Sequence, residues 1–270
     1  MSATAVRVSP AWLVRREPAD AAARSAELAG RLRRYLPPGP LVIHDLGGGS
    51  GAMGRWLAPR LRGPQHWILH DRDADLLELA VADPPGPAAD GRAVTVEARR
   101  SDITQLAPED LAGASVVVAS ALLDLLTVRE LLRMLYVCAG LPMLLALTVL
   151  GRVTLAPADP LDARIAAAFN GHQRRTTTTG RRLGPAAVTA AVEELRGAGA
   201  EVLVRPSPWR LDAGQADLVA EWFGGWLAAA CEQEPALAAE AGAYRDRRLA
   251  QAAAGELTVT VAHADVLVLP

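Results

Sequence analysis

Leu41-Val-Ile-His-Asp-Leu-Gly-Gly-Gly-Ser-Gly51 is the stretch of sequence that decides the fold of this chain. Its apolar first half predicts a buried strand that closes on Asp45, and its second half is a loop rich in glycine. Glycine has no Cβ, so such a loop can turn sharply and approach a ligand closely. A helix is predicted from Ala52 to about Ala58, and its free amide groups would point at whatever the loop holds. The unit is typical of a nucleotide-type cofactor site in an α/β protein.

Further apolar runs with strand character alternate with helical segments along the chain. Most runs are continuous rather than alternating, as expected where helices cover both faces of a parallel sheet. The order predicts an α/β fold with a doubly wound, mostly parallel seven-stranded sheet and extra helices. The expected strands are Leu41–Leu46, His66–Asp71, Ala93–Ala98, Ser115–Ser120, Pro142–Val149, Glu201–Arg205 and Leu257–Leu269. The expected helical segments are Pro18–Tyr35, Ala52–Ala58, Ala74–Ala82, Val128–Ala139, Asp159–Asn170, Pro185–Ala198, Ala213–Glu232 and Ala236–Ala254.

Length and composition favour one large unit. The chain has 270 residues, of which 51% are hydrophobic and 21% charged, which is ordinary for a globular protein. We expect an N-terminal helical segment over 1–40 and a single domain over 41–270, with helical insertions at 151–199 and 207–256.

Charge and composition also exclude several functions. The net charge of −2 gives no general attraction to nucleic acid or to anionic membranes. All 28 basic residues are arginine, so lysine Schiff-base chemistry is impossible. Residues 1–10 lack the apolar core of a signal peptide, and the uncharged run at 134–150 is interrupted by glycine and proline, so we expect a cytoplasmic protein. No grouping of His, Cys and acidic residues has metal-ligand spacing, so no metal is expected. The sequence does not indicate an oligomeric state.

Two cofactor templates overlap in the glycine loop. Gly49–Gly54 satisfies the dinucleotide pattern G-x-G-x-x-G, which is a weak signal alone. Asp45–Gly51 satisfies D-x-G-x-G-x-G, and here the chain resembles the class I S-adenosylmethionine-dependent methyltransferases. The register favours this second template, because an acidic residue closes the strand. The resemblance implies a Rossmann-like methyltransferase fold, and S-adenosylmethionine bound over Asp45 and the loop glycines, namely Gly47, Gly48, Gly49 and Gly51.

Acidic residues at the next two strand ends strengthen the resemblance. By it, Asp71 is the ligand of the ribose hydroxyls, with Arg72 beside it. Asp102 would accept a bond from the adenine amino group, Ile103 would pack on the ring, and Ser120 would close the fourth strand beside the cofactor. The alternative for each acid is a structural role as the cap of a turn or helix.

The methyl acceptor is less constrained. The Asn/Asp-Pro-Pro-aromatic motif of enzymes that methylate nucleobase or amide nitrogens is absent after Ser120, so a small-molecule acceptor is expected. Asp124 lies where the mouth of the active site should be, although it could equally begin a helix. His172, with an unperturbed pKa of about 6.5, is a second candidate base, or else a surface histidine at a helix end.

Two arginines, two histidines and the function itself each have more than one interpretation. Arg16 and Arg24 could reach the methionine carboxylate of the cofactor, but a salt-bridged helix surface is the favoured interpretation. His44 and His70, each one residue before a predicted ligand acid, are interpreted as satisfied core histidines. The alternatives to a small-molecule methyltransferase are an NAD-dependent oxidoreductase using the same loop, and a protein-directed or inactive cofactor-binding homologue.

Overall fold

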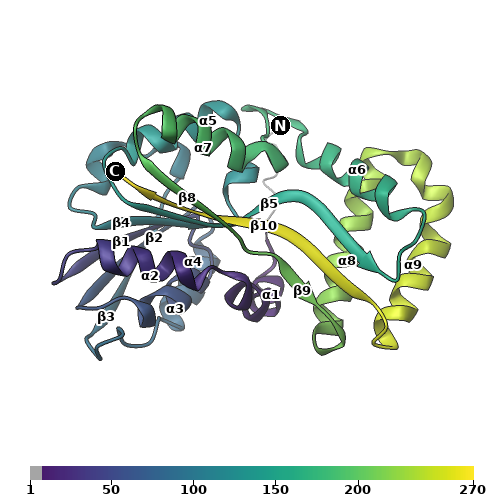
Figure 1. The fold of residues 1–270 in the computed structure, drawn as a ribbon, viewed down its shortest axis with the longest axis horizontal. Helices are drawn as coiled ribbons and strands as arrows, with labels where there is room; N and C mark the ends of the chain where they lie inside the picture. The colour runs from purple at the N-terminus through teal and green to yellow at the C-terminus, as the bar shows by residue number, and fades with distance from the viewer. Residues whose placement is uncertain (1–7) are drawn as a thin grey trace.

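A mostly parallel sheet forms the centre of the computed structural model, which describes residues 8–270 (Figure 1). The strand order is β3-β2-β1-β4-β5-β10-β8, with β9 paired to β10 beside this path. Strands β1 to β5 run parallel to their neighbours, whereas β10 is inserted antiparallel between β5 and β8. The strands of this path are β1 (Leu41–Leu46), β2 (Gln65–Asp71), β3 (Val94–Arg100), β4 (Val116–Ser120), β5 (Met143–Ala156), β8 (Glu201–Pro206) and β10 (Thr258–Leu269).

Helices cover both faces of this sheet (Figure 1). On one face lie α2 (Ala26–Tyr35), α3 (Ala52–Leu57) and α4 (Ala74–Ala82), whose buried side chains share a core with Ile43 of β1. The other face is covered by two helices, α5 (Val128–Val137) and α7 (Ala187–Gly197). The predicted doubly wound α/β fold is therefore confirmed.

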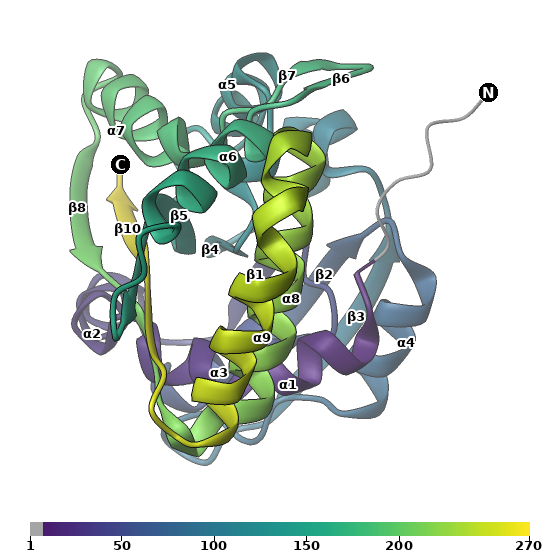
Figure 2. The same cartoon turned by 90° about the vertical axis from the view of Figure 1, so that its right-hand side faces the viewer.

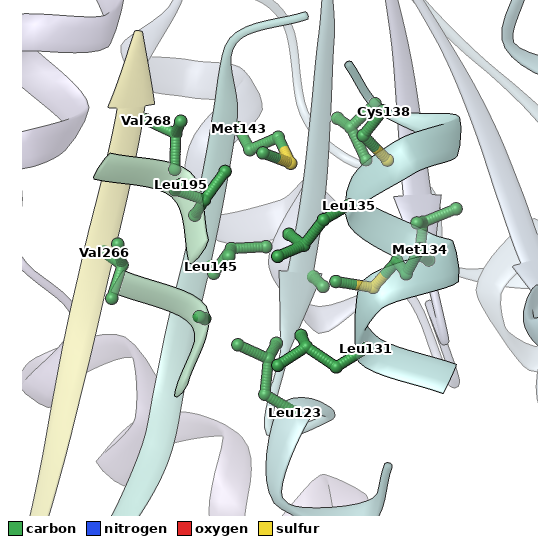
Figure 3. Close-up of a cluster of buried hydrophobic side chains, with 14 of the residues drawn as sticks. Leu123, Leu131, Met134, Leu135, Cys138, Met143, Leu145, Leu195, Val266 and Val268 are labelled. Carbon is green, nitrogen blue, oxygen red and sulfur yellow. The ribbon is translucent and has the colours of Figure 1, made fainter. Parts of the chain in front are cut away.

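Figure 3 shows the core beneath α5 and α7. Leu131 and Leu135 of α5 and Leu195 of α7 meet Leu145 of β5 and Val266 of β10. All five side chains are buried, and burial of a side chain of this size contributes roughly 1.5–3 kcal/mol. This packing holds the helices to the sheet and so fixes the strand ends that carry the site.

A second layer of helices extends beyond the sheet (Figure 2). Strand β5 continues past its buried part and pairs with β10 as far as Thr258, with β9 on the other side of β10. A separate core fills the space between this ribbon and the helices, built around Phe223, Trp226 and Tyr244. The elements of this extension are α1 (Pro10–Ala23), α6 (Asp162–Gln173), β9 (Trp209–Leu211), α8 (Ala216–Gln233) and α9 (Ala238–Ala253).

The structure differs from the sequence-based expectation at several places. Strand β5 runs to Ala156 rather than to the expected end at Val149. The sequence does not indicate this last part, because it is a half-exposed ribbon without a continuous apolar run. The segment 171–184, between two predicted helices and expected to be a polar loop, contains the end of α6 and a short hairpin of β6 (Thr176–Thr177) and β7 (Gly180–Arg181). The first helical segment is divided in two at Ser25, whose side chain caps α2 by accepting a bond from Leu28 N.

Within residues 8–270, no helix combines the length and the apolar character that a membrane crossing requires.

Candidate active site

The glycine loop leaves β1 and folds back over the end of β2. The amides of Gly47 and Gly48 donate to the carbonyl oxygen of His70, at 2.8 and 3.2 Å. A Cβ at Gly48 would lie 3.1 Å from Leu69 Cγ and 3.3 Å from the Asp45 carboxylate, so a larger residue here would require these neighbours to shift. The loop is therefore seated directly on Asp45.

Asp45 is a buried acid with unused hydrogen-bonding capacity. Its side chain is fully buried, and neither carboxylate oxygen has a hydrogen-bond partner among the described residues. Burial raises the pKa of Asp45 to about 7, and the nearby charge of Asp71 adds to this shift while that of Arg24 opposes it. A buried carboxylate without donors is costly unless a ligand supplies them.

Arg24 is a second buried ionisable group, and its charge acts on the pKa of Asp45. Its Nη2 donates to Ser120 Oγ at 3.1 Å and its Nη1 to the carbonyl oxygen of Ala52 at 3.4 Å, whereas Nε has no partner in residues 8–270. The side chain is 5% exposed, and burial lowers the pKa of this arginine. The favoured sequence interpretation, a salt-bridged helix surface, is therefore wrong for Arg24. Helix α1 ends at Ala23, and the Arg24 guanidinium reaches the end of β4 and the start of α3.

Arg16 does match the interpretation as a paired helix residue. Its guanidinium donates to both oxygens of Asp20, one turn along α1, at 2.9 and 3.2 Å. Asp20 also accepts a bond from Trp209 Nε1 at 2.9 Å, and Trp209 lies 5.0 Å from the Arg16 guanidinium. These contacts attach α1 to the helical extension.

Helix α1 also crosses the glycine loop. The side chain of Leu13 lies 3.7 Å from where a Cβ of Gly49 would stand. Glu17 accepts two hydrogen bonds from Arg55 of α3, at 2.7 and 2.6 Å. The helix is thus held by these polar contacts and by partly buried apolar residues such as Trp12, and Asp20 is its one buried side chain within Pro10–Ala23.

The two acids at the ends of β2 and β3 face the same edge of the sheet. Asp71 accepts bonds from the amides of Gly49 and Asp73, both at 2.9 Å, one on each carboxylate oxygen. Each oxygen keeps a lone pair for a further donor. Asp71 therefore links the glycine loop to β2.

Asp102 has the capping role that the sequence left open. It accepts bonds from Thr104 N and Oγ1, at 2.9 and 2.7 Å, and lies 3.8 Å from Arg72 Nε. Burial opposes ionisation, yet the bonds from Thr104 hold the pKa of Asp102 below its usual value. Ile103 is 8% exposed and belongs largely to the core under α5. Contact of Asp102 and Ile103 with a cofactor base stays a prediction.

Asp124 follows β4 on a short helical turn, Leu123–Leu125. This turn lies beside the glycine loop, because Leu122 Cδ1 would be 3.2 Å from a Cβ at Gly47. The side chain of Asp124 is 8% exposed, and burial raises its pKa to about 6 against the opposing charges of Arg16 and Arg182. Asp124 is therefore an acid near the loop that changes charge close to neutral pH.

His172 belongs to a different group of contacts. It lies in the last turn of α6, and its Nε2 is 3.2 Å from Glu232 Oε2 of α8. Arg175 pairs with the same Glu232, and the His172 side chain is 28% exposed. The structure thus places the two candidate bases on separate elements, and assigns His172 a partner in the helical extension.

The architecture is also found in known structures. A provisionally assigned type II methyltransferase from Anaeromyxobacter dehalogenans is 18% identical over 91% of this chain and 96% of that chain, with a TM-score of 0.52. S-adenosylmethionine-dependent methyltransferases from Geobacter sulfurreducens and Thiobacillus denitrificans, both in complex with S-adenosyl-L-homocysteine, are 14% and 15% identical, with TM-scores of 0.46 and 0.45. These two alignments cover 98% and 96% of this chain, and 100% and 99% of the other chains.

No protein-family model and no curated protein matches the sequence. The strand order and the likeness to the Anaeromyxobacter structure show the Rossmann-like methyltransferase fold.

Proposed function

We propose that the chain is an S-adenosylmethionine-dependent methyltransferase that acts on a small-molecule acceptor. The observation that carries the proposal is the buried pair of Asp45 and Arg24 beneath the glycine loop. Among residues 8–270, the acid has no donor to its carboxylate oxygens and the guanidinium has an N–H without an acceptor. Together they complement an ammonium group and a carboxylate, which are the two charged ends of the methionine part of this cofactor.

The other predicted ligands fit the rest of the cofactor. Asp71 has free lone pairs at the end of β2, where the ribose hydroxyls would be held, and Arg72 flanks it. Asp102 and Ile103, at the exit of β3, would meet the adenine ring. Ser120 would act through Arg24, whose guanidinium it contacts.

Electrostatics disfavour the rival cofactor. A dinucleotide places its pyrophosphate at a glycine loop of this kind. Here the loop is seated on the buried carboxylate of Asp45, 3.3 Å from where a Cβ of Gly48 would stand. A pyrophosphate at that place would lie close to the Asp45 carboxyl group, and the ionised form of this group would repel it. NAD is therefore the weaker candidate.

Bound S-adenosylmethionine supplies a methyl group on a sulfonium centre. The chain has to hold an acceptor in line with that group, which can contribute roughly 7–11 kcal/mol to catalysis. Where the acceptor carries a proton, Asp124 is the base that we propose. Its raised pKa of about 6 lies near neutral pH, which suits proton removal. His172 stays the second candidate for this role.

The acceptor side is proposed to consist of three parts: the turn after Ser120, the segment 159–183 and helix α1. Arg182, in the segment 159–183, forms an isolated antiparallel β-bridge with Thr127. Its charge lowers the pKa of Asp124. Helix α1 contributes Arg16, which acts on Asp124 in the same way.

Isothermal titration with S-adenosylhomocysteine, S-adenosylmethionine and NAD tests the cofactor. We expect both adenosyl compounds to bind and NAD not to bind. Binding of NAD without either adenosyl compound would overturn the proposal. Release of S-adenosylhomocysteine in the presence of a metabolite extract then separates a small-molecule enzyme from an inactive or protein-directed homologue.

A further inference from the structure

We propose that His70 is a positioning residue of the cofactor site, acting through a buried hydrogen-bonded chain of His44, His70 and Ser101. This chain crosses the ends of the first three strands and sets the relative positions of the three acids that follow. The inference rests on the proposed function, since the three acids matter as ligands of one cofactor.

The chain consists of two hydrogen bonds. His44 Nδ1 lies 2.9 Å from His70 Nε2, and His70 Nδ1 lies 3.0 Å from Ser101 Oγ. The two imidazole rings are stacked, with centroids 5.2 Å apart and planes inclined by 17°. Each histidine is 1% exposed, so water does not compete for the bond between them, whereas Ser101 is half-buried. One side chain from β1, one from β2 and one from the exit of β3 are thereby connected.

Each member of the chain stands one residue before a predicted ligand acid. His44 precedes Asp45, His70 precedes Asp71, and Ser101 precedes Asp102. Successive side chains of a strand point to opposite faces, so the chain and the strand-borne acids occupy different sides of the sheet. Any sliding of one strand end against its neighbour changes the spacing of the acids, and the side-chain bonds resist that sliding.

The backbone of His70 gives the ring a direct route to the glycine loop. The His70 carbonyl oxygen accepts both Gly47 N and Gly48 N, and the next residue, Asp71, accepts Gly49 N. A shift of His70 would therefore move three loop amides and the proposed ribose ligand together. The Asp71 carbonyl also accepts Ser101 N at 2.9 Å, which extends the connection to the third strand.

The chain is better suited to positioning than to stability. The sequence interpretation as satisfied core histidines holds for His70, which uses both ring nitrogens, but not for His44. His44 Nε2 is buried and has no partner in the part of the chain that the structure describes. Such an unpaired polar atom costs stability, and apolar replacement of a buried polar pair is often neutral or favourable. Two imidazoles at this place therefore call for a reason besides folding.

Titration of S-adenosylhomocysteine into His70→Leu and His70→Gln variants tests the proposal. Leucine removes both hydrogen bonds, and we expect affinity to fall on the order of ten- to a hundredfold. The glutamine amide has a donor and an acceptor, and we expect it to recover most of the loss. The matched control is His66→Leu on the same strand, because His66 contacts Thr95 Oγ1 and Glu97 Oε2 of β3 at the far end. This control should bind as the unaltered chain does.

Urea unfolding of the same variants separates positioning from stability. A purely structural role would lower the unfolding midpoint of His70→Leu and leave the affinity of the folded protein unchanged, and that result would overturn the proposal. If His70→Leu does not fold, Ser101→Ala decides, because it removes one link at the edge of the chain. We expect weaker binding there also, and unchanged affinity would count against the proposal. Failure of the unaltered chain to bind S-adenosylhomocysteine would instead refute the proposed function.

Discussion

Replacement of Asp45 by Asn should stabilise the chain above neutral pH and at the same time weaken cofactor binding. The carboxyl group has a pKa raised by burial from 3.8 to about 7. Folding therefore favours its protonated form. The corresponding stability is fully present below about pH 3.8 and is lost as pH rises through about 7.

The size of the effect follows from the shift. A difference of about three pKa units corresponds to roughly 4 kcal/mol of unfolding free energy, which is present at low pH and has been lost above about pH 7. The unaltered chain loses about 2 kcal/mol of this stability between pH 5.5 and pH 8. Because asparagine does not titrate, the advantage of Asp45→Asn over the unaltered chain should grow by that amount across this interval.

Urea unfolding at pH 5.5 and pH 8, followed by circular dichroism, measures the stability. Titration with S-adenosylhomocysteine at pH 8 measures the binding, which should weaken because the ammonium group loses its anionic partner. Asp246→Asn is the matched control, since Asp246 is an exposed carboxylate on α9. A variant with the same pH dependence of stability as the unaltered chain would refute the assignment of the raised pKa. Full-strength binding would refute Asp45 as a ligand.

Three other substitutions address the proposed site and the core. Arg24→Met should weaken S-adenosylhomocysteine binding by about ten- to a hundredfold in a titration, because a buried charged hydrogen bond is lost, whereas Arg33→Met on the exposed side of α2 should not. Asp124→Asn should lower methyl transfer by ~10²–10⁴-fold with unchanged cofactor affinity, and should abolish the rise in activity that Asp124 ionisation gives as pH passes about 6. His172→Gln assayed beside it should retain turnover, and the reverse pattern would assign the proton transfer to His172. Leu57→Ala removes a fully buried side chain and should lower the unfolding free energy by about 2–5 kcal/mol in urea.

The sequence predicted the sheet well wherever the signal was local. Strand β1 and helix α4 have the bounds that the sequence indicated, Leu41–Leu46 and Ala74–Ala82. Both are short segments whose apolar pattern and flanking residues carry the information, such as the Asp73 cap of α4. The strand order came from the structure, since the sequence predicted only a doubly wound, mostly parallel sheet.

Other elements depended on contacts that the local pattern does not contain. The last part of β5 is a strand because β10 pairs with it from more than a hundred residues away, with Ala156 opposite Thr258. Strand β9 likewise exists through its pairing with β10. Neither has a continuous apolar run, since these edges are half exposed.

The sequence by itself therefore determined which residues end β1, β2 and β4, because strand, glycine and helix signals are local. It located Asp45, Asp71, Asp102 and Asp124 without any knowledge of their surroundings. Only the tertiary structure decided that Asp45 is fully buried and that Arg24 turns inward to Ser120, 96 residues away. It likewise joined His44 to His70. Burial and hydrogen-bond partners set the charge and the chemistry of these groups, and both are supplied by residues distant in the chain.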